Sequence, residues 1–443
     1  MKWKRSLRAA AHSVARASLA AVKAGALFRG SVRRSGAKLF VQGRPCDLSR
    51  FRRVYLAALG KSAPDMARRA AALLGSRLEA GVVVCLSGTE ISLPRVACLA
   101  ASHPLPDGRS IRAARALLGL ARRAGEGDLL LVLLSGGGSA LASLPAEGLG
   151  LRDKQAVTNA LLRAGAGIHE LNAVRKHLSG IKGGRLAEAA RPATVLNLVV
   201  SDVVGNDLGV IASGPTHWDE TTFRGARQVL EKYGIWERAP RSVRRAIEEG
   251  RAGRRPETLR RGHPAFRRVR TQILGDNMTA LRAAAERASA LGFETRILDA
   301  ADSGEAREAA ARYARLLEKR LDRRRNRRPL CFLAGGELTV TVRGKGRGGR
   351  NMEFCLALLE EWRDRRGAWL AMSLGTDGRD GPTDAAGAWV SPSLVRRAER
   401  LGLEPGAFLR DNDSYVFFEK SGGLVRTGPT GVNVMDLRLF LFD

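Results

Sequence analysis

The most constraining feature of this sequence is a series of short apolar runs between residues 53 and 204, separated by helical stretches. Four runs stand out: VYLAAL (54–59), VVVCLS (82–87), LLLVLL (129–134) and TVLNLVV (194–200). Apolar runs of strand length that alternate with helical patterns are typical of βαβ units around a parallel sheet. Only 5% of the residues are aromatic, as expected for Ala-, Leu- and Val-rich helices packed on parallel strands. We therefore predict an α/β fold.

Each run ends in a polar turn, and the turns share small and charged residues. They are Gly60-Lys61-Ser62, Ser87-Gly88, the segment 135–139 and Ser201-Asp202. In an open α/β sheet, ligands bind outside the carboxyl ends of the strands. We expect these four turns to converge on one crevice that contains the chemistry.

A second α/β pattern follows a polar, arginine-rich stretch. Residues 251–264 read as a linker, and later segments predict strands at 269–275, 294–299 and 369–375, with helices from Asn277 and Asn351. Residues 331–344 read as two strands around a tight Gly335-Gly336 turn. A length of 443 residues favours two or three domains at roughly 150 residues each. We predict domains at 1–262 and 263–443, with residues 1–28 supplying a first helix of the fold.

The glycine-rich turn after the third run is the clearest ligand-binding signal. It follows a buried strand and opens a helix, so its backbone N–H groups and the helix dipole can hold a phosphate or carboxylate. Three glycines between two hydroxyl residues are more than a tight turn requires. The predicted anion-binding residues are Ser135, Gly136, Gly137, Gly138 and Ser139.

Lys61 follows the first strand in a Gly-Lys-Ser turn that resembles the end of a Walker A loop. Tyr55 stands where that loop needs its first glycine, so it is not a P-loop. Lysine is rare beside arginine in this chain, so its presence here favours a point charge for a phosphoryl group or carboxylate over a solvated side chain.

Residues 344–349 match G-x-G-x-x-G but do not predict a dinucleotide site. The match follows the expected hairpin, not the first strand of a βαβ unit, and Asp364, the candidate acid some twenty residues on, falls at a helix end. What remains is a loop with Lys345, Arg347 and Arg350, which suits the binding of a transferring phosphoryl group.

Oxygen-bearing side chains gather at the other turns. The candidates for Mg²⁺ or for acceptor contact are Asp202, Asn206, Asp207, Glu337 and Asp377, because Mg²⁺ prefers oxygen ligands and usually takes one or two carboxylates beside substrate phosphates. Asp380 precedes a glycine, and we interpret it as a turn-forming residue and not as a ligand. We expect Arg175 and Lys176 either to face an anionic ligand or to form a solvated basic face. We include Lys176 among the predicted phosphate-binding residues.

The formal net charge of +31 does not by itself predict a nucleic-acid partner. The excess is arginine spread over the whole chain, and the one dense block, Arg323 to Arg328, reads as a solvated linker. Five cysteines are scattered without metal-ligand spacing, which favours a reducing cytoplasm. No run is long and apolar enough to span a bilayer. We expect no nucleic acid, no membrane partner, and a monomer or homodimer.

Several long motifs together identify a family resemblance. They include LSGGGSAL, IHELNAVRKHLSGIKGGRLA, SDVVGNDLGVIASGPT, GGELTVTVRGKGRGGRNMEF and SLGTDGRDGPTDAAGA, within a match from about Ala9 to Leu441. The chain resembles the glycerate 2-kinases of the MOFRL type, whose members are also called glycerate kinase type II or hydroxypyruvate reductase. The resemblance implies a Rossmann-like N-terminal domain, a smaller C-terminal MOFRL domain, and an active site in the cleft between them.

The resemblance also implies the reaction and its principal residues. It implies that ATP with Mg²⁺ phosphorylates D-glycerate to 2-phosphoglycerate, and its proposed catalytic lysine and arginine fall on Lys61 and Arg350. Asn206 and Met352 depart from the family pattern, which commonly has Asp and Gln there; Met352 removes an amide from the expected site. The rival reading, an NAD(P)H-dependent hydroxypyruvate reductase, has no dinucleotide fingerprint in a valid context.

Overall fold

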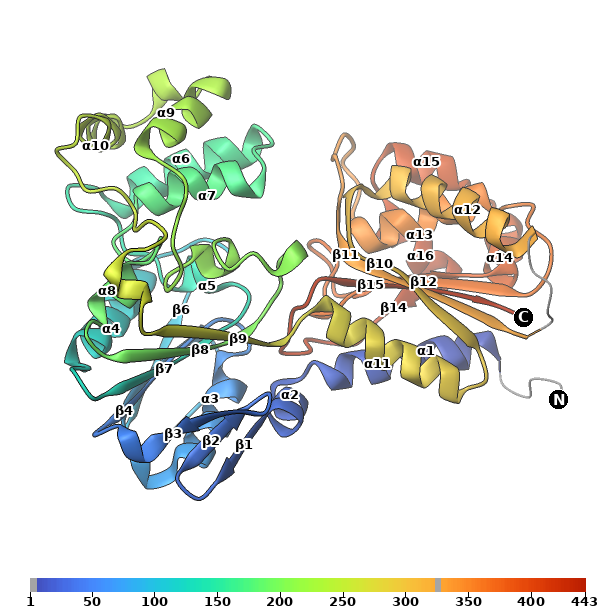
Figure 1. Ribbon diagram of the computed structural model, residues 1–443. Coiled ribbons are helices and arrows are strands. Elements are labelled where there is room, and N and C mark those ends of the chain that lie inside the picture. The colour runs from blue at the N-terminus through green and yellow to red at the C-terminus, as the bar shows by residue number, and fades with distance from the viewer. Residues whose placement is uncertain (1–5, 323–327) are drawn as a thin grey trace. The chain divides into compact units, whose positions relative to one another are not determined.

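The apolar runs between residues 54 and 200 form neighbouring strands of one sheet in the computed structural model, which describes residues 6–322 and 328–443 (Figure 1). The strand order is β6-β5-β4-β7-β8-β9, and every strand pair from β6 to β8 is parallel. The strands are β4 (Val54–Leu59), β5 (Leu78–Leu86), β6 (Val96–Ala101), β7 (Leu129–Leu134), β8 (Thr194–Val200) and β9 (Val269–Gly275). In chain order this is 3-2-1-4-5-6, the Rossmann arrangement, so the predicted fold class is confirmed.

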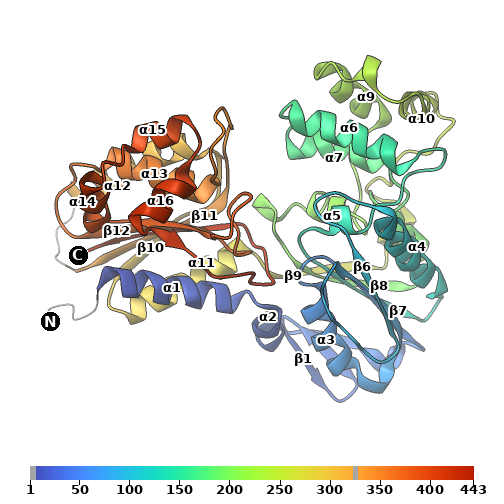
Figure 2. The ribbon, with the colours of Figure 1, turned by 180° about the vertical axis from the view of Figure 1, so that it is seen from behind.

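The central strands are apolar throughout because helices cover both faces of the sheet. Tyr55, Ala57 and Leu59 share a core with helix α4 (Gly108–Arg123), and the alternate residues Leu56 and Ala58 are also fully buried. Helix α3 (Ala63–Leu74) packs on β4 and β5 as well. Figure 2 shows α3 and α4 on opposite sides of these strands.

Further helices and a small sheet complete this part of the chain. Four helices share a core of their own: α6 (Leu151–Arg163), α7 (Ile168–His177), α9 (Phe223–Lys232) and α10 (Arg241–Arg251). The shorter elements are α2 (Ala24–Ser31), α5 (Gly138–Leu141), α8 (Arg185–Ala189) and the antiparallel strands β1 (Val32–Ser35), β2 (Lys38–Val41) and β3 (Arg44–Asp47). Single 3₁₀ turns lie at Leu48–Arg50, Gly75–Arg77, Val204–Asn206, Ile211–Ser213, Trp236–Arg238 and Pro264–Phe266.

A second six-stranded sheet has the order β10-β11-β15-β12-β13-β14 and is antiparallel except for β10 and β11. Its strands are β10 (Glu294–Glu305), β11 (Leu330–Thr339), β12 (Trp369–Gly375), β13 (Gly387–Val390), β14 (Leu424–Val425) and β15 (Asp436–Phe442). Its helices are α1 (Leu7–Ala21), α11 (Asn277–Ala290), α12 (Ala306–Asp322), α13 (Arg350–Glu361), α14 (Pro392–Arg400), α15 (Pro405–Arg410) and α16 (Ser414–Ser421). The expected second α/β unit is therefore present.

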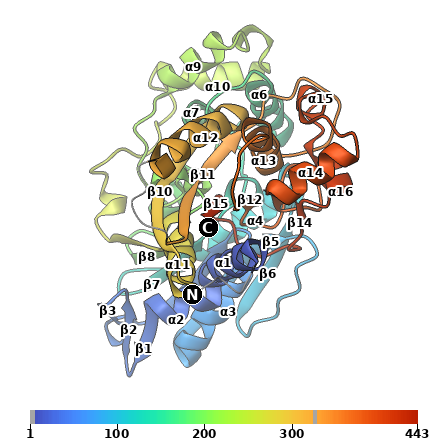
Figure 3. The ribbon, with the colours of Figure 1, turned by 90° about the vertical axis from the view of Figure 1, so that its right-hand side faces the viewer.

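The chain divides into a larger unit, residues 27–274, and a smaller unit, residues 1–26 with 275–443. This division differs from the predicted boundary after residue 262. The run at 269–275 is β9, an edge strand of the first sheet, and the expected linker 251–264 belongs to the larger unit, where Thr258 and Leu259 are buried. Helix α1 belongs to the smaller unit because it packs against α11, as Figure 3 shows. The predicted linker in the arginine block falls largely on residues 323–327, outside the described residues.

The prediction of two strands around Gly335-Gly336 is wrong, because residues 330–339 form the single strand β11. Gly336 has a φ of +97°, and a Cβ there would lie 2.1 Å from the carbonyl oxygen of Asp302 on β10. The β10–β11 pairing is irregular at this point. The glycine permits close approach of a neighbouring strand and does not reverse the chain.

Candidate active site

The Gly-Lys-Ser turn and the glycine-rich turn lie against each other at the carboxyl edge of the first sheet. The chain leaves β4 toward β5 on one side, and β7 lies on the other, so these turns flank the topological switch point where such sheets bind ligands. The N–H of Lys61 donates to the carbonyl of Gly136 (2.8 Å), and the N–H of Ser62 donates to Oγ of Ser135 (3.0 Å). The predicted convergence of these two turns is confirmed.

Asp202, from the turn after β8, lies over the glycine-rich turn. A Cβ added to Gly136 would come within 2.2 Å of Oδ2 of Asp202, so only glycine lets the carboxyl group approach the backbone here. Burial raises the pKa of Asp202 to about 6, against the opposing charge of Lys61. The lysine, the turn and one carboxyl group therefore meet at one edge of the sheet.

The two other predicted oxygen ligands from this region have different contacts. Oδ1 of Asp207 accepts the N–H of Gly209 (2.8 Å), and its Oδ2 lies 3.8 Å from Nδ1 of His169. Asn206 has a φ of +58° within the 3₁₀ turn that follows Asp202. Among the predicted acids of the larger unit, Asp202 is the one in contact with the glycine-rich turn.

Beside the glycine-rich turn is a cavity of about 320 Å³, lined in part by Gly137 and Ser139. Three cationic side chains also line it: Lys154 of α6, Arg175 of α7 and Lys182. Burial, followed by the charges of Arg175 and Arg185, lowers the pKa of Lys154 to about 7. Burial also lowers the pKa of Arg175 to about 10 and that of Lys182 well below its usual value.

Lys176, predicted to bind phosphate, has a protein partner instead. Its Nζ lies 3.2 Å from Oδ1 of Asp219, and both side chains are buried. The neighbouring Arg175 lines the cavity. Sequence reasoning did not single out Lys154 and Lys182, which line this cavity, although the rarity of lysine that singled out Lys61 was a usable signal for them.

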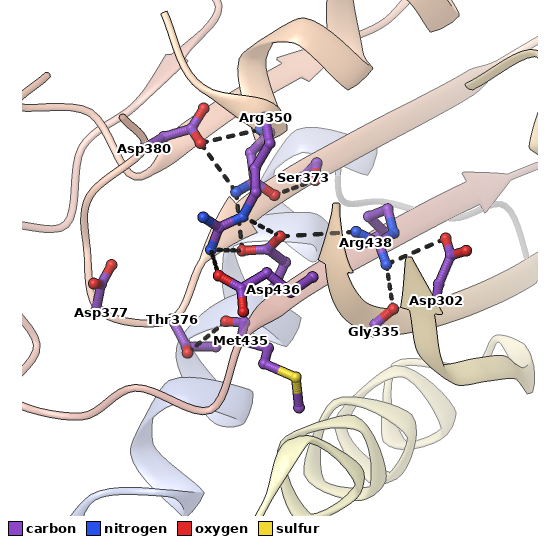
Figure 4. Close-up of polar contacts among 12 residues, drawn as sticks. Asp302, Gly335, Arg350, Ser373, Thr376, Asp377, Asp380, Met435, Asp436 and Arg438 are labelled. Atoms are coloured by element: carbon purple, nitrogen blue, oxygen red, sulfur yellow. Dashed lines mark hydrogen bonds and ion pairs between the residues drawn. The ribbon is translucent and has the colours of Figure 1, made fainter. Parts of the chain in front are cut away.

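Arg350, in the smaller unit, is the first residue of α13 and is held by two carboxylates. Its Nε and Nη2 pair with Oδ2 and Oδ1 of Asp436 at 2.7 and 2.9 Å (Figure 4). Its Nη2 also lies 3.2 Å from Oε1 of Glu337. Burial opposes the charged form, but Asp436 and Glu337 outweigh it and raise the pKa of Arg350 above its usual value. The guanidinium is thus permanently charged and fixed in direction.

The N-terminus of α13 is occupied by a carboxyl group from another loop. The N–H groups of Asn351 and Met352 donate to Asp380, at 3.1 and 2.8 Å. A Cβ on Gly349 would lie 2.4 Å from the Asp380 carboxyl, so glycine at this N-cap admits the acid. Burial raises the pKa of Asp380 to about 6. Asp380 therefore caps a helix, which corrects its reading as simple turn chemistry.

The structure also changes the expectations for Met352 and for the glycine-rich loop at residues 344–349. Met352 is fully buried in the hydrophobic core, so the side chain at this position does not lie in a ligand site. The glycines of the 344–349 loop allow close packing, since a Cβ on Gly344 or Gly346 would clash with Asp411. The guanidinium of Arg347 lies over the ring of Tyr415 at 4.5 Å.

Asp377 lies in the turn after β12 (Figure 4), and its Oδ1 accepts the N–H of Arg379 at 3.0 Å. Within residues 6–322 and 328–443, no three His, Cys, Asp or Glu side chains form a ready metal site.

Comparison with known proteins decides the family. A model described as a domain of unknown function, DUF4147, matches residues 10–248, and the MOFRL family model matches residues 330–436. A glycerate 2-kinase of Pyrococcus horikoshii is 41% identical over 419 residues, which cover 94% of this chain and 93% of the relative. The chain belongs to the glycerate kinase family.

The fold of this chain agrees with the crystal structure of another member of the family. The crystal structure of a glycerate kinase from Thermotoga maritima matches with a TM-score of 0.84 at 38% identity, and the match covers 99% of both chains. An Agrobacterium vitis relative, 40% identical over 94% of this chain and 93% of its own length, is provisionally named a hydroxypyruvate reductase. Membership makes this chain a kinase. The described helices include none with the length and apolarity needed to cross a bilayer.

Proposed function

We propose that this kinase transfers the γ-phosphoryl group of ATP to D-glycerate and forms 2-phosphoglycerate. Relatives that align with nearly the whole chain are named for glycerate phosphorylation. The structural observation behind the proposal is the pairing of Lys61 with the glycine-rich turn at the switch point of the sheet. Phosphoryl transfer requires mainly positioning and neutralisation of charge, and these groups supply both.

Lys61 and the backbone of residues 135–139 would hold the phosphoryl oxygens. The lysine provides a point charge, and the glycines leave the turn's backbone open to close approach. Asp202 fits Mg²⁺, since one carboxylate beside a phosphate site is the usual protein share of its ligands. Bound Mg²⁺ would neutralise charge on the phosphates. Metal or acceptor contact by Asn206, Asp207, Glu337 and Asp377 stays a prediction.

Arg350 would bind the acceptor carboxylate or the transferring group. Asp436 and Glu337 engage its Nε and Nη2. We assign Nη1 to the substrate, because a guanidinium held on two sides presents its remaining nitrogen in a fixed direction.

A coupled assay of ADP release tests the proposed function. Purified protein with ATP and Mg²⁺ is offered D-glycerate, L-glycerate, hydroxypyruvate and tartronate in turn. We expect D-glycerate to give the highest kcat/KM and its product to be converted directly by enolase, which accepts 2-phosphoglycerate. An ADP release rate with D-glycerate no higher than without acceptor would contradict the proposal. Hydroxypyruvate-dependent oxidation of NADH at a comparable rate would establish the reductase instead.

A further inference from the structure

The cavity beside the glycine-rich turn lies wholly within the larger unit, between helices α6 and α7 and the carboxyl edge of the sheet. Gly137 contributes to its wall, and a Cβ on Gly137 would lie 3.3 Å from Cγ of Lys61. One end of the cavity is therefore next to the lysine at which we place phosphoryl transfer.

The cationic side chains of this cavity have no carboxylate to neutralise them among the described residues that line it. Nζ of Lys154 is buried without a hydrogen-bond partner in the described structure, and the residue is only 5% exposed. Nζ of Lys182 donates to the backbone carbonyls of Ser139 (2.9 Å) and Ala142 (3.4 Å). A buried, unpaired ammonium beside other cations is costly, and an anion in the cavity would offset that cost.

Part of the cavity lining is apolar and exposed to solvent. Leu105 and Leu162 line it, although they are 54% and 52% exposed, and Pro104 lies beside them. Thr158 and Asn159 add hydrogen-bonding groups to the lining. A three-carbon hydroxy acid has no apolar surface to pack against these leucine side chains, and it would leave most of the 320 Å³ cavity empty. A nucleoside triphosphate has an anionic phosphate chain that can pair with the cationic side chains and a flat base that can pack against the leucine side chains.

We propose that this cavity is the nucleotide site, in which Lys154, Arg175 and Lys182 bind the phosphate chain and Leu105 and Leu162 contact the base. The assignment deepens the proposed function and rests on it for the identity of the donor. The terminal phosphate would then lie toward Gly137 and Lys61, and the site would need no contribution from Lys176.

Calorimetric titration with ATP and Mg²⁺, without any acceptor, tests this site directly. We expect Lys154→Met to raise the Kd for ATP at least tenfold while leaving the protein folded, because the change removes an unpaired buried charge. Lys319→Met, at an exposed lysine of α12, is the matched control and should bind ATP like the unchanged protein. A Kd within twofold of the unchanged protein for Lys154→Met would overturn the site.

A second variant separates the base from the phosphates. Leu162→Asn should weaken ATP binding several-fold but leave the affinity for inorganic tripolyphosphate unchanged, and equal losses for both ligands would contradict contact with the base. Steady-state kinetics then test whether Lys154 binds glycerate instead of ATP. A raised KM for glycerate together with an unaltered Kd for ATP in Lys154→Met would also overturn the proposal. Because binding is measured without glycerate, loss of ATP affinity in Lys154→Met supports the site even if glycerate proves not to be the acceptor.

Discussion

Glycine residues determine how closely polar groups approach one another around the candidate residues of each unit. Gly136 admits the carboxyl of Asp202 to the glycine-rich turn, and Gly349 admits that of Asp380 to the N-terminus of α13. In each case a side chain as small as that of alanine would overlap the acid. These glycines therefore serve close packing, in addition to any role in leaving N–H groups open for a ligand.

Lys61 is the single side chain on which the proposed chemistry depends most. Replacing Lys61 by Ala should lower kcat by about 10² to 10³, the usual loss when one group that stabilises a transition-state charge is removed. The melting temperature should stay unchanged, since Lys61 is neither deeply buried nor part of a hydrophobic core. Lys232→Ala, at a surface lysine paired with Glu170, is the control. Near-normal turnover of Lys61→Ala would remove the residue from the mechanism.

Lys154 predicts a pH dependence of stability. Its pKa is lowered from 10.5 to about 7 by burial, with Arg175 of α7 and Arg185 of α8 adding to the effect and Lys182 also facing it. Between pH 7 and about 10 the unfolded chain binds a proton at this residue that the folded chain lacks, so the free energy of unfolding must rise with pH.

Urea unfolding of the unchanged protein and of Lys154→Met measures this effect, because the difference between them cancels the other titrating groups. We expect the variant to be the more stable at pH 6, and the difference in stability to narrow steadily as the pH rises from 7 toward 10. Saturating ATP should narrow the gap at pH 6. A gap independent of pH would show that Lys154 does not titrate in this range.

The positions of site candidates were predictable from the sequence where those residues follow a strand that the sequence itself predicts. Lys61 and residues 135–139 each directly follow an apolar run, so the strand pattern alone placed them at one edge of the sheet. Lys154 lies in the first turn of helix α6, away from any apolar strand run, and only the packing of α6 near the glycine-rich turn gives it a cavity to face. Asp219, which pairs with Lys176, is 43 residues away from it, a contact that no local pattern indicates.

At the scale of elements, strand β15 shows how a buried ionic network escapes sequence analysis. Its segment DLRLFLF places Asp436 and Arg438 on alternate positions, the pattern of a strand with one exposed face. The structure buries both, because β15 lies between β11 and β12 in the middle of the sheet. Arg438 lies near Asp302 and Asp436, so Asp436 connects two arginines (Figure 4).

Removing the charge of Asp436 should therefore affect both stability and turnover. Asp436→Asn leaves Arg350 and Arg438 without their shared carboxylate, and breaking a buried pair typically costs about 3–5 kcal/mol. Asp384→Asn is the control, since its pair with Arg426 is exposed to solvent and should contribute little to stability. Chemical unfolding gives both values. If the two variants lose similar stability, the buried pairs of Asp436 stabilise the protein no more than an exposed pair does.

At the scale of the whole molecule, the smaller unit is assembled from two distant parts of the chain. The sequence predicts that residues 1–28 supply a first helix of the fold, but it does not predict which part of the fold this helix packs against. Val14 and Leu19 pack in the same core as Leu281 of α11, and Oγ of Ser18 donates to the carbonyl of Ala280 (3.0 Å). The predicted boundary groups α1 with residues 27–262, whereas its packing groups it with residues 275–443.

This assembly predicts that α1 stabilises the smaller unit selectively. Deleting residues 1–21 would expose the apolar surface covered by Val14 and Leu19, at roughly 1.5–3 kcal/mol for each large side chain. Hydrogen exchange followed by mass spectrometry should then show faster exchange in α11 and β12, which contact α1, and unchanged protection in β4 and β7 of the larger unit. The Val14→Ala variant of the full chain should change the same peptides to a lesser degree. Faster exchange in β4 and β7 of the deletion variant would mean that the helix supports the larger unit, contrary to its packing on α11.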